Sequence, residues 1–258
     1  METGAITQYV DVAQLVLYAF WIFFFGLVVY LTLESKREGF PMEPDGYGKR
    51  QKNKSTGLLP MPKPKVFRTQ YHGDFTAPHS RDDYDAPIAG KAVNAFPGAP
   101  IEPTGDDPML DDIGPGSYAQ RIDRPDLTAE GDFKIVPMRV DESFGISSSD
   151  VDPRGLEVKA FNGMSGAICT DIWVDRSEHI IRYLELKTNS GRAVLLPMNL
   201  CVVKKGILLV ESLLSDQFDK VPGTKNSNTV TLLEEEKIMA FYGAGTLMAF
   251  PRRRESVV

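Results

Sequence analysis

The chain has 258 residues and a formal net charge of −6, and hydrophobic residues make up 42% of it. This apolar content excludes a fully disordered chain, and a count of two cysteines excludes a disulfide scaffold. The negative balance argues against nucleic acid as the main partner, because there is no excess of cations to displace phosphate counterions. A mean hydropathy of −0.19 is too polar for a protein that crosses a membrane many times.

Residues 12–33 contain no charged side chain and predict one transmembrane helix, after a short periplasmic N-terminus at residues 1–11. As a helix the run is about 33 Å long, which is enough to cross a hydrocarbon core of about 30 Å. A cleavable signal peptide fits less well, because no Lys or Arg precedes the run and no small-residue cleavage site follows it. Cations are absent before residue 34 and frequent after it, so the positive-inside rule predicts a cytoplasmic C-terminal part.

Aromatic side chains are unusually frequent in this run, and they include Trp21 near its middle and Tyr30 near its end. Two interpretations stay open: the rings contact other transmembrane helices or lipid, or they are simply apolar filler. Because the run carries no ionisable group, the helix is not expected to be an ion or proton path itself.

Residues 34–110 are predicted to be an extended strap that lies on partner subunits. Eleven of the 18 prolines lie between Pro41 and Pro108, and proline disfavours regular helix and sheet. A flexible tether is the alternative. Apolar residues recur through the segment, however, and a simple tether would not need them.

Residues 111–258 are predicted to form a mainly β cytoplasmic domain, a small antiparallel barrel followed by a C-terminal helix. From about residue 153, short runs of β-forming residues are separated by turn signals such as Asn162-Gly163. Thr231 and Glu234 have the spacing of a capping box, and Gly243 and Gly245 are expected to weaken or end the helix that follows.

One polar constellation stands out in a predicted strand–turn–strand stretch, at Asp171, Asp175, Glu178, His179, Arg182 and Glu185. Neighbouring carboxylates push their pKa values apart, so such a cluster can pass protons between its members. A salt-bridged surface hairpin explains the same spacing. The two cysteines and three histidines suggest neither a nucleophile nor a metal site, and no catalytic motif is present.

At these residues the sequence resembles the H subunit of the photosynthetic reaction centre of purple bacteria, a member of the PRC-barrel family. The resemblance rests on ordered blocks over essentially the whole chain: residues 18–23, 37–41, 59–65, 103–106, 114–118, 134–138, 171–175, 182–186, 195–198 and 231–235.

The resemblance implies a non-catalytic subunit of the photosynthetic inner membrane. It would cap the L and M subunits on the cytoplasmic side and assist proton delivery to the secondary quinone. Bacteriochlorophyll, bacteriopheophytin, quinones and non-haem iron are expected in the partner subunits, and phospholipid and a light-harvesting antenna are further expected neighbours.

The resemblance also implies roles for particular residues. Asp175, Glu178, Arg182 and Glu235 match positions on the proton route of the family, whereas Tyr30 and Arg37 match positions at the membrane interface.

Some members carry paired histidines at the proton entry, where this chain has Glu130 and Asp132. We expect these two carboxylates and Asp126 to substitute for the histidines, with an ordinary pKa near 4 instead of 6.5.

The alternative function is a bitopic PRC-barrel adaptor that recruits a soluble partner to the membrane.

Overall fold

The computed structural model describes residues 4, 6–7, 11–38, 45–46, 49–50, 58–77, 89–96, 98–204 and 206–253, with backbone alone at 45–46 and 49–50. The chain divides into two compact units, Met1–Asp85 and Ala86–Val258. Each unit is described separately below.

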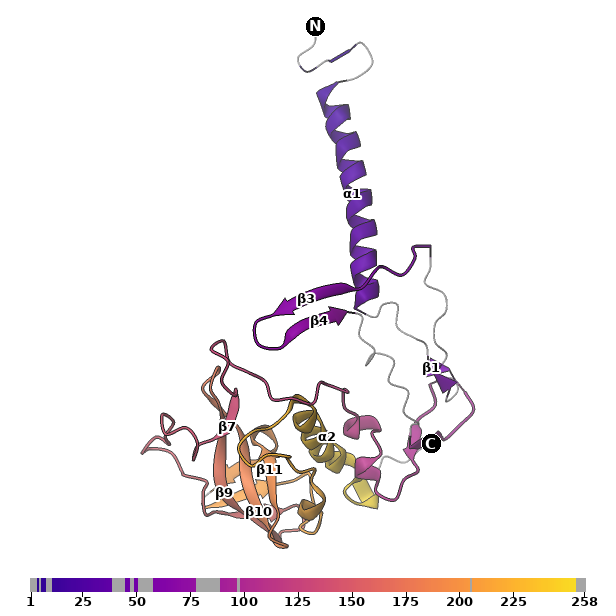
Figure 1. The fold of residues 1–258 in the computed structure, drawn as a ribbon. Helices are drawn as coiled ribbons and strands as arrows, with labels where there is room; N and C mark the ends of the chain where they lie inside the picture. Colours follow the sequence, from indigo (N-terminus) through magenta and orange to yellow (C-terminus); the bar gives the residue numbers. More distant parts are fainter. Residues whose placement is uncertain are drawn as a thin grey trace. The chain divides into compact units, whose positions relative to one another are not determined.

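The first unit contains the long helix α1, Val12–Arg37 (Figure 1). The Asp11 carboxylate accepts a hydrogen bond of 2.7 Å from the Gln14 amide and so begins the helix. Its apolar stretch is long enough to cross a membrane. The helix continues past the predicted span to Arg37, because the polar residues after Leu33 still favour helix.

Among its described residues, the first unit also contains two short two-stranded sheets: β1 (Asp45–Gly46) with β2 (Lys49–Arg50), and β3 (Lys65–Thr69) with β4 (Gly73–Ala77). In the second unit, β5 (Gly90–Ala92) pairs with β6 (Ile101–Pro103). The expectation that no sheet runs through 34–110 is therefore wrong locally. Between Lys65 and Ala77 there is no proline, so the amides needed for an antiparallel ladder are present.

A seven-stranded sheet forms the body of the second unit, with the order β11-β10-β9-β8-β13-β12 and with β7 also pairing with β9. The strands are β7 (Ile135–Pro137), β8 (Glu157–Ala160), β9 (Ser165–Asp175), β10 (Ile180–Thr188), β11 (Ala193–Pro197), β12 (Val202–Lys204) and β13 (Ile207–Val210).

The predicted small barrel is confirmed as a mainly β domain, with two differences in topology. The β8–β13 pair is parallel, whereas the other pairs are antiparallel. In the part of the chain that the structure describes, β11 and β12 are the two ends of the strand order, so hydrogen bonding does not close the sheet into a barrel.

Helix α2, Leu232–Met248, packs its buried face on the core (Figure 1). The predicted capping box is present, with Thr231 Oγ1 accepting from the Glu234 amide at 3.1 Å. The helix runs through both glycines, contrary to expectation. A Cβ at Gly243 would lie 2.6 Å from the Pro115 carbonyl oxygen, so close packing explains why glycine is needed there.

The core of this unit is dominated by large side chains from both sheet and helix, among them Trp173, Tyr242, Phe218 and Phe241. Short 3-10 turns connect the elements, at Pro108–Leu110, Gly114–Gly116, Met198–Leu200, Gln217–Lys220 and Pro251–Arg253. The two cysteines are buried, as expected of small core residues.

Candidate functional site

The tight turn between β9 and β10 is organised by the carboxylate of Asp175, the last residue of β9. Its Oδ1 accepts hydrogen bonds from the amides of Ser177 (2.9 Å) and Glu178 (3.0 Å). Aspartate favours such turns because its short side chain reaches the backbone two or three residues ahead. His179 closes the turn in the left-handed region at φ 54°. The side chain of Asp175 is therefore fixed, and it is fully buried.

Two cations neutralise this buried carboxylate. The Arg182 Nε donates to Asp175 Oδ2 at 3.2 Å, and its second terminal nitrogen lies 3.3 Å from Glu178 Oε1. The Lys134 ammonium lies 3.8 Å from both carboxylates. Lys134 reaches this place because β7 begins at the next residue, and Ile135 pairs with Asp175 in the sheet.

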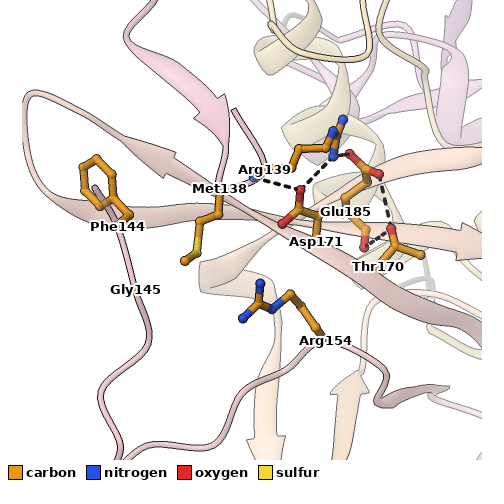
Figure 2. A pocket seen from close by; sticks show the side chains of 8 residues that line it. All are labelled: Met138, Arg139, Phe144, Gly145, Arg154, Thr170, Asp171 and Glu185. Carbon is orange, nitrogen blue, oxygen red and sulfur yellow. Dashed lines mark hydrogen bonds and ion pairs between the residues drawn. The ribbon is translucent and has the colours of Figure 1, made fainter. Parts of the chain in front are cut away.

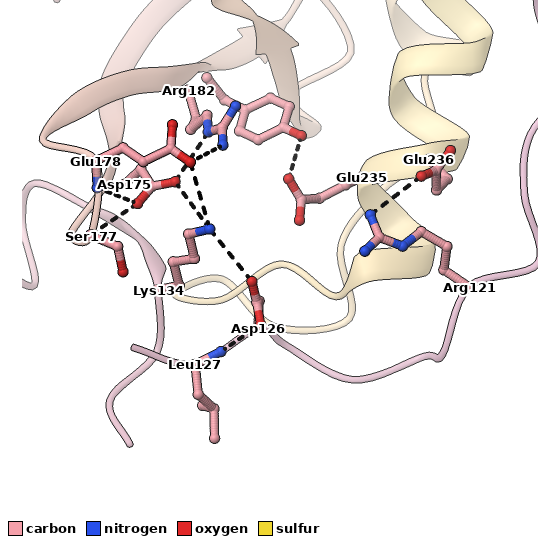
Figure 3. A network of polar contacts seen from close by, with 11 residues as sticks. Arg121, Asp126, Leu127, Lys134, Asp175, Ser177, Glu178, Arg182, Glu235 and Glu236 are labelled. Carbon is pink, nitrogen blue, oxygen red and sulfur yellow. Dashed lines mark hydrogen bonds and ion pairs between the residues drawn. The ribbon is translucent and has the colours of Figure 1, made fainter. Parts of the chain in front are cut away.

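Lys134 also extends the network to a third carboxylate, Asp126, at 3.6 Å (Figure 3). The Lys134 amide donates to the Asp126 carbonyl oxygen at 3.0 Å, which holds the two segments together. One ammonium group is thus shared by three carboxylates from two loops. Burial tends to lower the pKa of Arg182, but its hydrogen bond to Asp175 and the charge of Glu178 outweigh burial and raise it.

A fourth carboxylate, Glu235, comes from the first turn of α2 and accepts a hydrogen bond of 2.8 Å from the Tyr183 hydroxyl. Burial raises the pKa of Glu235, and the charge of Asp126 adds to this effect; the Tyr183 hydroxyl and the charges of Arg182 and Arg121 oppose it. Burial also raises the pKa of Tyr183, so this phenol stays protonated and acts as a donor.

Asp126, Lys134 and Arg182 of the Lys134 network, and Tyr183 with Glu235, line one open groove of about 800 Å³. Its lining mixes the charged network with apolar side chains: Arg121, Asp126, Lys134, Ile135, Ile180, Ile181, Arg182, Tyr183, Pro197, Met198, Asn199, Leu232, Glu235, Glu236 and Met239. The guanidinium of Arg182 stays charged in water and in proteins, so the proton-accepting groups of this groove are its carboxylates.

The sequence-predicted residues divide into two sets. Asp126, Asp175, Glu178, Arg182 and Glu235 line the groove or contact its network (Figure 3).

Glu130 and Asp132 occupy a short exposed loop, where their amides donate to Thr128 Oγ1 at 3.3 Å. Among the described residues their carboxylates form no ion pair, so their role in proton entry stays a prediction. Sequence reasoning missed Lys134 as the bridging cation, and its position immediately before a β-strand was the available signal.

The predicted constellation also proves to be two clusters. Asp171 and Glu185, which face each other in the β9–β10 register, both contact Arg139 at 2.8 Å. Trp173 Nε1 donates to Glu185 at 3.0 Å. Figure 2 shows this second cluster beside a depression of about 510 Å³. Because Arg139 donates to both carboxylates and Trp173 donates to Glu185, the cluster links β9, β10 and the segment after β7.

The predicted partner-contact residues lie on α1. Trp21 and Tyr30 expose 55% of their surface, and Trp21 packs edge-on against Phe20 and Phe24. Arg37 pairs with Glu34 and donates from Nε to the Lys63 carbonyl oxygen at 3.1 Å. Contacts of these residues with partners or lipid stay a prediction.

Comparison with known protein families identifies both parts of the chain. Residues 146–217, which hold most of the seven-stranded sheet, match the PRC-barrel domain, so this part of the second unit is a PRC-barrel domain. Residues 4–140, just over half of the chain, match the photosynthetic reaction centre H-chain N-terminal region. The chain therefore belongs to the H-subunit family of photosynthetic reaction centres, whose members are accessory subunits.

Proposed function

We propose that this chain caps the cytoplasmic face of the L and M subunits and assists proton delivery to their secondary quinone. In this proposal it performs no catalysis of its own. Bacteriochlorophyll, bacteriopheophytin, quinones and non-haem iron belong to the partner subunits. The observation that carries the proposal is the set of linked carboxylates around Lys134 and Arg182, in a chain of the H-subunit family.

The orientation of the chain rests on its charges. Lys36 and Arg37 end α1, while residues 1–33 carry no Lys or Arg, so the second unit is proposed to be cytoplasmic. The membrane would then be the photosynthetic inner membrane of the bacterium. The groove is proposed to face the side from which protons are taken up.

Each group in the network has a distinct proposed task. Asp126 and Glu178 have side chains that are about half exposed and therefore exchange protons with water. Asp175 is fully buried and is proposed to pass protons inward, while its contacts with Lys134 and Arg182 fix the position of its carboxylate. Glu235 holds a proton at higher pH than an ordinary glutamate, because burial raises its pKa.

Substituting Asp175→Asn and Glu178→Gln together tests the proton-delivery part in the intact complex. We expect flash-induced proton uptake and transfer of the second electron to the quinone to slow by about tenfold or more, since positioned acid–base groups contribute about 10²–10⁴-fold. Transfer of the first electron should be nearly unchanged. Asp152→Asn is the matched control, because this carboxylate pairs with Arg154 outside the groove.

Unchanged proton uptake in the double variant would refute proton delivery through these residues. The capping part has a separate test, which is gentle solubilisation of the native membrane. The chain should co-purify with pigment-bearing subunits. A colourless isolate would refute capping and favour the bitopic adaptor.

A further inference from the structure

The last turn of α1 holds the chain that follows the membrane span. The Lys36 ammonium donates to the Leu59 carbonyl oxygen, and Arg37 Nε donates to the Lys63 carbonyl oxygen at 3.1 Å. The Lys65 ammonium contacts Glu34 at 2.7 Å and lies 5.9 Å from the centre of the Tyr30 ring. Strand β3 therefore begins directly beside the end of the helix.

This attachment sets the depth of the β3–β4 hairpin relative to a membrane. The apolar stretch of α1 ends just before Glu34, so the attachment lies where hydrocarbon gives way to headgroups. Figure 1 shows the hairpin leading sideways from this end of the helix, and both belong to the first unit. A hairpin that leaves the helix sideways at this depth runs along the membrane surface.

The two faces of the hairpin differ in polarity. Phe67 is paired with Phe75, and alternation along the strands puts both on the face that also carries Ala77. Phe67 is 49% exposed. The opposite face carries Arg68 opposite Asp74 and Val66 opposite the polar Thr76. An isolated two-stranded hairpin is marginally stable in water, so contact of its Phe67 face with an apolar medium would stabilise it.

The charge of the hairpin segment matches an anionic surface. Residues 58–77 carry the cations Lys63, Lys65 and Arg68 against a single anion, Asp74. Lys63 and Arg68 are exposed, and among the described residues their side chains form no ion pair. Long cationic side chains beside an aromatic face are typical of segments that lie in the headgroup layer, because the stem stays apolar while the charge reaches phosphate.

We propose that the β3–β4 hairpin lies on the anionic phospholipid surface of the membrane that α1 crosses. Its Phe67 face points toward the acyl chains, and Lys63, just before the first strand of the hairpin, contacts headgroup phosphates. The hairpin thus forms a lipid-binding surface next to the span, and it does not depend on the proton-delivery role proposed above.

Spin labels on the full chain test this proposal in vesicles of phosphatidylglycerol and of phosphatidylcholine. Labels are placed singly at Phe67→Cys and, on the opposite face, at Val66→Cys as the matched control. Ala77→Cys is a second reporter that keeps Phe67 in place. The native thiols stay unlabelled, because both are buried and burial raises the pKa of Cys169 to about 12 and of Cys201 to about 11.

In phosphatidylglycerol vesicles the labels at 67 and 77 should be accessible to oxygen, which dissolves in the acyl layer, but not to a water-soluble nickel complex. The label at 66 should remain accessible to the nickel complex. Each cation near an anionic surface contributes about fivefold to binding. Lys63→Gln should therefore lower the ratio of docked to free label about fivefold. Lys187→Gln with Lys204→Gln, two cations of the second unit, should leave that ratio unchanged.

Equal access of the nickel complex to all three labels in phosphatidylglycerol would overturn the proposal. Protection that occurs only in the complex with other membrane subunits would overturn it as well, because the face would then bind protein. Protection in phosphatidylglycerol that weakens in phosphatidylcholine supports it.

Discussion

Replacing Asp175 with asparagine keeps the size of the side chain but removes its charge. The asparagine oxygen can still accept from the Ser177 and Glu178 amides, so the turn is retained. Its amide group, however, then faces the donor groups of Arg182 and Lys134, which lie 3.2 and 3.8 Å from Oδ2. Two cations lose their buried partner.

The expected cost follows from burial and distance. Breaking a buried ion pair costs about 3–5 kcal/mol. The side chains of Arg182 and Lys134 are 38% and 21% exposed, and Lys134 keeps its other two carboxylates, so the low end applies. We expect a loss of about 3 kcal/mol in the free energy of unfolding. Glu178→Gln is the matched control: its side chain is 50% exposed, and exposed pairs contribute about 0–1 kcal/mol.

Urea unfolding of the full chain in detergent micelles measures both losses. Trp173 is buried in the core of the same unit and reports unfolding by its fluorescence, and a Trp21→Phe background removes the other tryptophan. With a slope of about 1–3 kcal/mol/M, a loss of about 3 kcal/mol lowers the midpoint by about 1–3 M. A midpoint shift for Asp175→Asn no larger than that for Glu178→Gln would refute the reasoning.

Three further outcomes are expected. The pKa of Glu235 in the folded chain is raised above its ordinary 4.5, so the unfolded chain releases this proton first, and the free energy of unfolding falls as pH rises through the folded pKa. Glu235→Gln keeps an acceptor for Tyr183 but does not titrate. Urea unfolding of this variant should therefore show a smaller fall in the free energy of unfolding between pH 4 and 7. Thr231→Ala should lower the free energy of unfolding by about 1 kcal/mol, and Thr231→Ser should restore most of this loss. Equal urea midpoints for the two variants would show that the Thr231 hydroxyl does not stabilise the helix. Gly245→Ala places a Cβ 2.4 Å from the Ser212 carbonyl oxygen and should cost about 1–3 kcal/mol in thermal unfolding, whereas a stabilised variant would show that the helix moves freely.

Local sequence patterns were sufficient for most elements of the second unit. The runs that became β9, β10, β11 and β13 have clear β-forming residues between turn signals, as the sequence indicates from about residue 153 onward. The capping box at Thr231 likewise depends on residues three positions apart. Such features are set by neighbours along the chain, which a sequence displays directly.

Features set by distant contacts could not be read in this way. Gly245 seemed to end α2, but its lack of a side chain instead allows close contact with the backbone at Ser212. The separation of Asp171 from Asp175 depends on Arg139 and Lys134, which arrive from a segment before β8. No local pattern indicates which carboxylate each cation will meet, so the sequence indicated several residues of the cluster but not their partners.

The parallel pairing of β8 with β13 has a consequence for how this protein is made. Glu157 lies opposite Ile207, so the pair closes a long stretch of chain, whereas β9, β10 and β11 are joined by short turns. Closing a long loop costs conformational entropy before the contacts between its ends can offset that cost. Pairs of strands that are far apart in the sequence therefore tend to form late in folding. During synthesis the helix α1 leaves the ribosome first and the β9–β11 meander follows. Until β13 emerges, β8 is paired on one side only and is a temporary edge of the sheet, which makes this the stage most exposed to misassembly.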